Sequence, residues 1–269
     1  MTQSSPVTAP LPRWMAHAPE YAAEAFGLGL FMVSACGFGA LLYHPASPVV
    51  MAVPSPLVRG LMMGLAMGLT CVLNVYSPWG RRSGAHLNPA FTLAFYRLGK
   101  VARGDVVGYI LAQFVGGLAG TGVAVLLFHP WVGDPSVNYV ATVPGPWGVP
   151  VAFAAELAIS FGLMLVVLTV LSQPRLARYT GFFAGTVIAL YIAFEAPVSG
   201  MSMNPARTVG SAAFAHVWTG LWLYFAAPLL GMFLAVELAR RVETIRGRHC
   251  AKLHHDDRIR CIFCEHHAR

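Results

Sequence analysis

Residues 83–96 read SGAHLNPAFTLAFY and residues 199–214 read SGMSMNPARTVGSAAF, so in both stretches three residues separate Ser-Gly from Asn-Pro-Ala. Asparagine is a preferred helix N-cap, and proline suits the first helical position, where its missing N–H needs no partner. Each Asn-Pro pair therefore predicts a helix with a defined start. Both stretches are too apolar for a solvated loop and too short to cross a bilayer. We expect each to be reentrant, an extended segment followed by a half-helix.

The composition outside these stretches excludes a soluble globular protein. The 269 residues are 57% hydrophobic and only 11% charged, whereas soluble domains carry roughly 25% charged residues. Apolar runs long enough to cross about 30 Å of hydrocarbon occur six times, at residues 22–43, 57–76, 105–128, 149–172, 179–196 and 217–239. Six transmembrane helices are therefore predicted.

The six predicted spans form two similar halves. Ala-Ala-Glu opens span one at Glu24 and span four at Glu156, and each Asn-Pro-Ala follows the second span of its half. Because three is an odd number of crossings, the halves must face opposite ways across the membrane, as in inverted-repeat transporters and channels. The predicted fold is an all-α membrane protein with six transmembrane helices and two reentrant half-helices in an inverted 3+3 repeat.

The basic residues predict the orientation of the chain. Lys and Arg cluster after spans two, four and six, while residues 129–148 contain none. Under the positive-inside rule both termini are cytoplasmic, in an inner or plasma membrane. The predicted parts are a flexible N-terminal tail (1–20), a first repeat (21–128), an extracytoplasmic connecting loop (129–148), a second repeat (149–241) and a cytoplasmic tail containing His and Cys (242–269).

The net charge of +7 does not indicate a nucleic-acid-binding protein, because the basic residues lie between apolar runs instead of forming a soluble basic face.

The extended parts of the reentrant stretches are predicted to line a water-filled passage. Non-helical backbone at membrane depth survives only where it is buried in protein or faces a wet cavity. The carbonyl groups expected to face the water are those of Gly84, Ala85, His86, Leu87, Gly200, Met201, Ser202 and Met203.

These motifs resemble those of the aquaporins, or major intrinsic proteins, over residues 21 to about 241. The resemblance rests on SGAHLNPA, SGMSMNPAR, the Glu24 and Glu156 pair and Gln113. It implies six tilted helices around a pore, two half-helices that meet at mid-membrane, and a homotetramer. It also implies passive conduction of water or small neutral solutes, without a cofactor. The motif residues placed at the pore centre are Asn88, Pro89, Ala90, Asn204, Pro205 and Ala206.

Two half-helices that meet end to end place their positive dipole ends at the pore centre, where cations and protons are repelled. The side-chain amides of Asn88 and Asn204 are expected to donate to a passing water and interrupt a proton wire.

The resemblance assigns the selectivity filter to Arg207, Ile192 and Met201, with either Met67 or Gly68 from span two. An ion pair of Arg207 with Glu156 or Glu195 is the alternative to a filter role. An ionisable residue at membrane depth is a functional candidate by default.

The expected function is a water channel that excludes protons and ions, and the apolar Ile192 and Met201 allow for leakage of small neutral solutes. A facilitator for glycerol, urea or similar solutes is the alternative. An ion-coupled transporter would need a carboxylate or cation site at the midplane, and neither reentrant stretch contains Asp or Glu. An enzyme is not expected, since no catalytic or metal-ligand set can be assembled at one depth.

Glu24 and Glu156 lie inside predicted spans, where a carboxylate is costly unless it is hydrogen-bonded. A proton relay is one interpretation. The favoured one is that each carboxylate supports a reentrant stretch by accepting its backbone N–H groups.

The C-terminal tail contains His249, Cys250, His254, His255, Cys261-x-x-Cys264, His266 and His267, which are ligand types for zinc or copper. A solvated tail in which these residues are incidental is the favoured interpretation, so no metal site is assigned.

Overall fold

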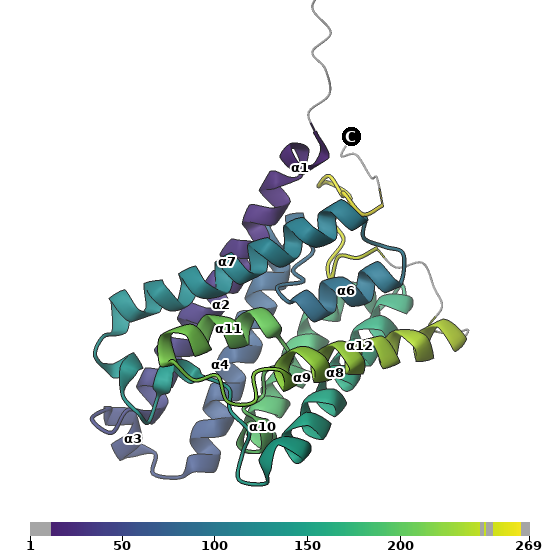
Figure 1. Cartoon of the computed structure of the whole chain (residues 1–269). Helices are drawn as coiled ribbons and strands as arrows, with labels where there is room; N and C mark the ends of the chain where they lie inside the picture. Colours follow the sequence, from purple (N-terminus) through teal and green to yellow (C-terminus); the bar gives the residue numbers. More distant parts are fainter. Residues whose placement is uncertain (1–11, 243–244, 246–249, 265–269) are drawn as a thin grey trace, which may run out of the picture.

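The computed structural model describes residues 12–242, 245 and 250–264 (Figure 1). In this part of the chain six helices are long and apolar enough to cross a membrane. They are α2 (Ala18–Tyr43), α4 (Pro56–Tyr76), α7 (Arg103–Phe128), α8 (Gly148–Ser172), α9 (Thr180–Phe194, preceded by η3, Ala177–Tyr179) and α12 (Leu223–Arg241). The prediction of a six-span all-α membrane protein is confirmed.

Shorter helices connect the spans. Two of them are the half-helices expected after Asn-Pro, α6 (Pro89–Arg97) and α11 (Pro205–Ala215). The others are α1 (Arg13–Ala16), α3 (Pro48–Ala52), α5 (Pro78–Ser83), η1 (Trp131–Gly133), η2 (Asn138–Val140) and α10 (Ala196–Ser199).

The packing of the spans follows the inverted repeat. In each half the first span packs along the third, so α2 lies against α7 and α8 against α12. The middle spans of the two halves, α4 and α9, pack against each other. The two halves are thus joined at α4 and α9.

Glycine permits the closest of these contacts. A Cβ on Gly120 of α7 would lie 2.4 Å from the backbone oxygen of Gly29 in α2, and one on Gly231 of α12 would lie 2.3 Å from that of Leu157 in α8. Membrane helices lack a hydrophobic force to join them, so close backbone packing supplies the attraction.

The outer faces of the spans are apolar. On α4 the side chains of Leu65, Leu69 and Leu73 form one exposed stripe, four residues apart. A stripe of this kind would be costly in water and suits contact with lipid tails.

The sixth span begins later than predicted, at Leu223 instead of residue 217. After α11 ends at Ala215, His216 and Gly220 adopt left-handed φ angles of 53° and 66°. These residues turn the chain from the half-helix into the span, so a helix cannot begin among them.

Helical structure begins nearer the N-terminus than predicted. Residues 13–20 were predicted to be flexible, but they form α1 and the first residues of α2. The carboxylate of Asp105, at the start of α7, lies 3.2 Å from Arg13 and 2.6 Å from His17 and so anchors them. Residues 1–11 lie outside the described residues.

Both described ends of the chain lie at the same end of the bundle, where α1 and the yellow C-terminal segment appear together in Figure 1. Arg260 of that segment donates to the backbone oxygen of Ala16 at 3.4 Å. An even number of crossings requires this arrangement.

Candidate functional site

Each half-helix starts at its asparagine, as the sequence predicts. The Oδ1 atom of Asn88 accepts the N–H of Ala90 at 2.9 Å, and that of Asn204 accepts the N–H of Ala206 at 3.1 Å. Both asparagines have extended backbone angles and are followed by proline at the first helical position. The caps therefore fix where the two helices begin.

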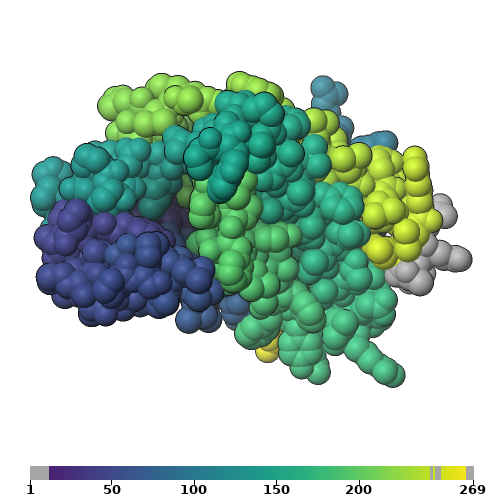
Figure 2. Space-filling model, turned by 90° about the horizontal axis from the view of Figure 1, so that it is seen from below, coloured from purple at the N-terminus to yellow at the C-terminus, as the bar shows by residue number. Residues whose placement is uncertain are grey.

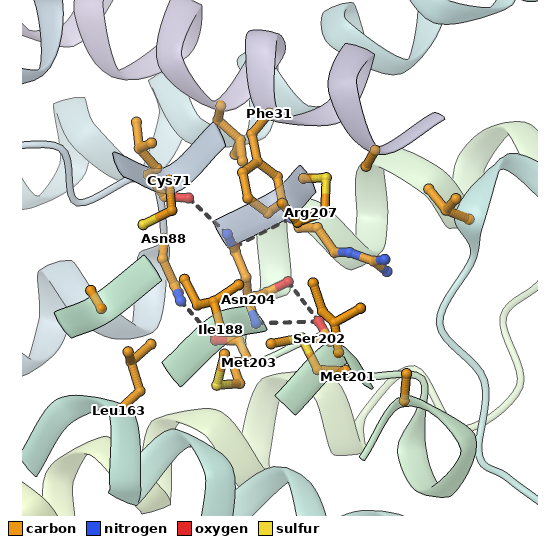
Figure 3. Close-up of a pocket in the computed structure, with 18 of the residues that line it drawn as sticks. Phe31, Cys71, Asn88, Leu163, Ile188, Met201, Ser202, Met203, Asn204 and Arg207 are labelled. Carbon is orange, nitrogen blue, oxygen red and sulfur yellow. Dashed lines mark hydrogen bonds between the residues drawn. The ribbon is translucent and has the colours of Figure 1, made fainter. Parts of the chain in front are cut away.

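The other end of each asparagine amide joins the two halves. Asn88 Nδ2 donates to the carbonyl of Met203 at 2.7 Å (Figure 3), and Asn204 Nδ2 donates to that of Leu87 at 2.7 Å. The bonds are reciprocal, since each cap reaches the residue before the opposite cap. The two helix N-termini, with their partial positive charges, are thereby held close together.

Glu24 holds the first reentrant stretch through its backbone. Its carboxylate accepts the N–H of His86 at 3.0 Å and the N–H of Leu87 at 2.6 Å. Gln113 Nε2 donates to the same carboxylate at 2.8 Å.

Glu156 holds the second stretch in the same way. It accepts the N–H groups of Ser202 at 2.6 Å and Met203 at 2.7 Å, and the hydroxyl of Ser199 at 2.8 Å. Both carboxylates are fully buried, so these bonds offset the cost of their desolvation. They are the bonds that a loop-supporting role requires.

The supported backbone is strained at matching positions. Ala85 and Leu87 have φ angles of 56° and 50°, and their counterparts Met201 and Met203 have 49° and 52°. Left-handed backbone costs about 1–2 kcal/mol at a residue other than glycine. The hydrogen bonds from Glu24 and Glu156 hold the chain in this conformation.

A cavity of about 380 Å³ runs between the two stretches. Since a liquid water occupies about 30 Å³, it has room for several waters. Its wall is mainly apolar, and the polar side chains that reach it include Asn88, Asn204, Arg207 and Ser202. A hollow between the purple and green helices is visible in the view from below (Figure 2).

Arg207 extends into this cavity from α11, away from the asparagine pair (Figure 3). Its Nη1 atom is buried and has no hydrogen-bond partner among the described residues. Within the same residues no ion pair includes Arg207, so the alternative pairing with Glu156 or Glu195 does not occur. A buried N–H without a protein partner is available to a solute in the cavity.

Of the other candidates for the selectivity filter, three line the cavity and Gly68 does not. Ile192, Met201 and Met67 line the cavity, and Ile192 packs against the hydrophobic cluster that contains Met67. Gly68 faces α9 instead, where a Cβ would lie 2.6 Å from the backbone oxygen of Gly185. Of the two span-two alternatives, Met67 is the one that reaches the cavity.

Three of the carbonyls expected to face water also accept a hydrogen bond from the protein. The oxygens of Leu87 and Met203 accept the asparagine amides. The oxygen of Gly84 accepts the N–H of Leu253, at 3.1 Å, from the C-terminal segment. A carbonyl oxygen has two lone pairs, and Leu87 and Met203 both line the cavity, so these bonds do not contradict the prediction. Ala85, His86, Gly200, Met201 and Ser202 are among the residues that line the cavity.

A tyrosine pair that supports the stretches was missed. Tyr109 of α7 donates to the carbonyl of Ser83 at 2.6 Å, and Tyr224 of α12 donates to that of Ser199 at 2.5 Å. The repeat could have revealed them, because each lies four residues before an equivalent position, Gln113 or Pro228.

The C-terminal segment was also misjudged. Residues 250–264 were expected to be solvated, but Ala251, Lys252, Leu253 and Cys261 are buried. Leu253 reaches the cavity wall at the end where His86 lies, which we call the tail-side mouth. His249, His266 and His267 lie outside the described residues.

Comparison with known proteins gives the same assignment. The family model described as "Major intrinsic protein" matches residues 13–238. The chain is 34% identical over 234 residues to "Probable aquaporin NIP7-1" of Arabidopsis thaliana, covering 85% of this chain and 78% of that protein. It is 40% identical over 166 residues to "Probable aquaporin NIP-type" of Nicotiana alata, covering 61% and 59%. The chain thus matches less than two thirds of the Nicotiana protein.

A solved structure has the same fold. The aquaglyceroporin from Plasmodium falciparum superimposes with a TM-score of 0.69 at 20% sequence identity, covering 84% of this chain and 96% of that one. The family match over most of the sequence agrees with the six spans and the two capped half-helices, so the chain belongs to the major intrinsic protein family.

Proposed function

We propose that the protein is a passive channel for water that excludes protons and ions and lets small neutral solutes leak. The observation that carries this proposal is the cavity that passes the linked caps Asn88 and Asn204 and reaches the unpartnered Nη1 of Arg207. The relatives' names, aquaporin and aquaglyceroporin, support a channel for water or small neutral solutes.

Ion exclusion would come from the joined helix ends. Two half-helix N-termini, each with a partial charge of about half an elementary charge, and the guanidinium of Arg207 place positive potential along one passage. A cation or hydronium would meet this barrier without compensating carboxylates, because Glu24 and Glu156 are occupied by backbone N–H groups.

Selectivity would be set beside Arg207. Ile192, Met201 and Met67 are the proposed partners of Arg207 in the filter, and all three line the cavity. Because these side chains are apolar, a solute does not need to form hydrogen bonds with them in order to pass. The second candidate function is therefore a facilitator for glycerol or urea, favoured by the apolar wall and by the aquaglyceroporin neighbour.

The membrane arrangement is proposed from the same features. Both termini would be cytoplasmic in an inner or plasma membrane, because the described ends share one end of the bundle and the basic segments follow spans two, four and six. A homotetramer in the bilayer is the proposed assembly, and cross-linking in membranes would test it.

Stopped-flow light scattering of reconstituted vesicles tests the function. The full chain and Leu253→Gly, which removes the tail side chain from the cavity, are compared with protein-free vesicles. A sucrose gradient should shrink the channel vesicles faster, while an imposed pH gradient should decay no faster than in protein-free vesicles. Solute-driven swelling ranks glycerol and urea against water. Water flux at the protein-free rate for both proteins would refute the channel.

A further inference from the structure

Four potential metal ligands come together in the C-terminal segment. They are Cys250, His255, Cys261 and Cys264, and their ligand atoms all lie within 4.8 Å of one another. The sulfur of Cys250 is 3.4 Å from that of Cys261 and 4.0 Å from that of Cys264. With Zn–S bonds of about 2.3 Å, a tetrahedral zinc site places its sulfurs about 3.8 Å apart. The four side chains therefore have the type and spacing of a Cys3His zinc site.

The histidine has the carboxylate partner that metal-bound imidazoles commonly have. His255 Nε2 lies 3.1 Å from Asp257 Oδ1. Such a contact orients the ring and fixes its tautomer, which leaves Nδ1 as the atom directed to the metal.

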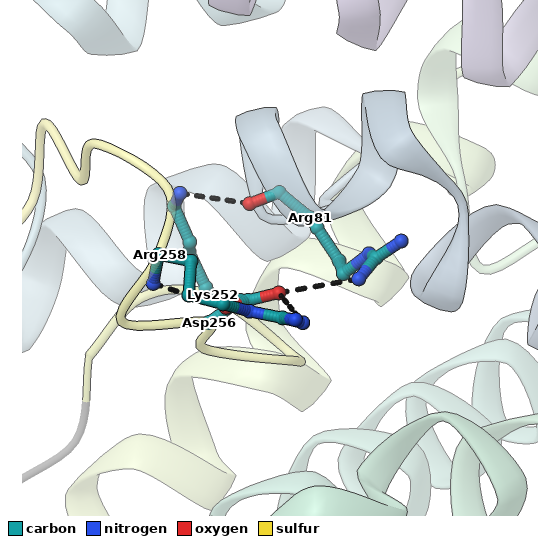
Figure 4. A network of polar contacts seen from close by, with 4 residues as sticks. All are labelled: Arg81, Lys252, Asp256 and Arg258. Atoms are coloured by element: carbon teal, nitrogen blue, oxygen red, sulfur yellow. Dashed lines mark hydrogen bonds and ion pairs between the residues drawn. The ribbon is translucent and has the colours of Figure 1, made fainter. Parts of the chain in front are cut away.

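A lysine joins the two arms of this ligand loop and ties them to the channel. Lys252 is almost fully buried, and its Nζ donates to the carbonyl of Arg81 at 2.8 Å (Figure 4). It also donates to the carbonyl of Arg260 at 3.1 Å. Asp256 adds an ion pair to Arg81 at 3.1 Å and another to Arg258 at 2.9 Å (Figure 4). The ligand loop is thus attached to α5, immediately before the first reentrant stretch.

The same segment covers the tail-side mouth. The N–H of Leu253 donates to Gly84 at 3.1 Å, and the Nε2 of His86 is 2.6 Å from the carbonyl of Ala251. Phe263 stacks on His86 with ring centroids 5.5 Å apart. These contacts use the reentrant stretch itself, and the Leu253 side chain completes the cavity wall.

This segment is held in place without the support of regular secondary structure. Residues 250–264 contain no helix and no strand of more than one residue, so their order is not supported by a regular backbone ladder. Fixing their backbone costs conformational entropy at every residue, and the burial of Ala251, Leu253, Cys261 and Ile262 offsets part of that cost. Structural zinc sites contribute such ordering energy directly.

We propose that zinc bound by Cys250, His255, Cys261 and Cys264 holds residues 250–264 as a plug in the tail-side mouth, and that loss of the metal opens the channel. The metal site stands on the ligand geometry alone. The gating part rests on the proposed channel function.

Metal content of the purified full chain tests the site. Elemental analysis should find about one zinc per chain, and cobalt substitution should give the absorption bands of a tetrahedral thiolate site. The double variant Cys261→Ser/Cys264→Ser should lose both signals. Cys36→Ser, which alters a buried cysteine of α2 that belongs neither to the cluster nor to the cavity lining, should keep them. Copper in place of zinc, a Cys250–Cys261 disulfide in the chain purified without reductant, or equal zinc in both variants would overturn the site.

Water flux in proteoliposomes tests the gate. A membrane-permeant chelator should raise the flux of zinc-loaded wild type and of Cys36→Ser several-fold, and zinc should reverse the increase. The double variant should conduct at the high rate with or without chelator. Leu253→Gly should conduct while retaining zinc, which separates the plug from the metal. An unchanged wild-type flux after zinc removal would overturn the gate. If no sample conducts in any metal state, the channel proposal fails, while the zinc content still decides the site.

Discussion

Asn204 caps α11 with its oxygen and donates from its nitrogen to the carbonyl of Leu87, 117 residues earlier in the chain, at 2.7 Å. One side chain thus fixes both the start of a helix and its distance from the opposite loop. Asn88 does the same in reverse. The position of the two positive helix ends therefore depends on side chains that can donate and accept at once.

Asn204→Asp separates these two roles. Aspartate caps helices as well as asparagine, so α11 should still form, but the carboxylate cannot donate to Leu87 and adds negative charge at the pore centre. We expect increased proton or cation leakage. The measurement is pH-dye quenching in proteoliposomes under an imposed pH gradient.

Asn138→Asp in η2 is the matched control and should leave the leak at the wild-type level. An equally proton-tight Asn204→Asp channel would contradict the proposed role of the asparagine pair.

The sequence was sufficient for the parts of the fold that depend on local signals. Long apolar runs predicted the six spans, and the two Asn-Pro caps predicted the half-helices because capping is decided within a few residues. The rotation of a helix is harder to predict. Met67 and Gly68 are neighbours about 100° apart on α4, so a one-residue uncertainty in matching span two to the family pattern changes which of them is predicted to reach the cavity.

The C-terminal segment shows a second limit. Its contacts join Lys252 to Arg81 and Leu253 to Gly84, across more than 160 residues of sequence. No periodicity or cap marks such pairs, and a segment rich in His, Arg and Asp has the composition of a solvated tail. The metal-ligand types were visible, but their convergence required the folded chain.

Glu156→Gln should destabilise the second reentrant stretch. Glutamine offers one acceptor oxygen in place of two and points an NH2 group at the N–H donors of Ser202 and Met203. A buried donor left unpaired costs about 1–3 kcal/mol. We expect a lower thermal midpoint in detergent and a lower water flux, and the same for Glu24→Gln.

Glu237→Gln, at a partly exposed ion pair with Arg97, should leave both quantities almost unchanged, and a comparable loss there would refute the loop-supporting role.

Arg207→Val should widen the narrow part of the cavity and remove its positive charge. Nη1 is unpartnered, and the guanidinium forms no ion pair among the described residues, so the fold should tolerate the change. Glycerol and urea fluxes should rise relative to water, and protons should leak.

Ile192→His makes the complementary change by adding a hydrogen-bonding side chain to the wall that Ile192 shares with Met67. The glycerol-to-water flux ratio should fall, while Ile192→Val, which alters only size, should raise it or leave it unchanged. Identical ratios in Arg207→Val, Ile192→His and wild type would show that selectivity is set elsewhere.

Gly120→Ala and Gly104→Ala make the same substitution in α7 with opposite expected results. A Cβ at Gly120 would lie 2.4 Å from the backbone oxygen of Gly29 in α2, whereas nothing lies within 4 Å of one at Gly104. Because the contact is backbone against backbone, α2 and α7 must separate, and overpacking of this kind costs about 1–3 kcal/mol. At Gly104 alanine only restricts the unfolded chain, which stabilises the folded protein by about 0.4–1 kcal/mol.

Unfolding in detergent should occur at lower temperature for Gly120→Ala and at the same or higher temperature for Gly104→Ala. Equal midpoints would mean that the α2 and α7 pair can move apart without cost, and that close glycine packing does not hold the repeat together.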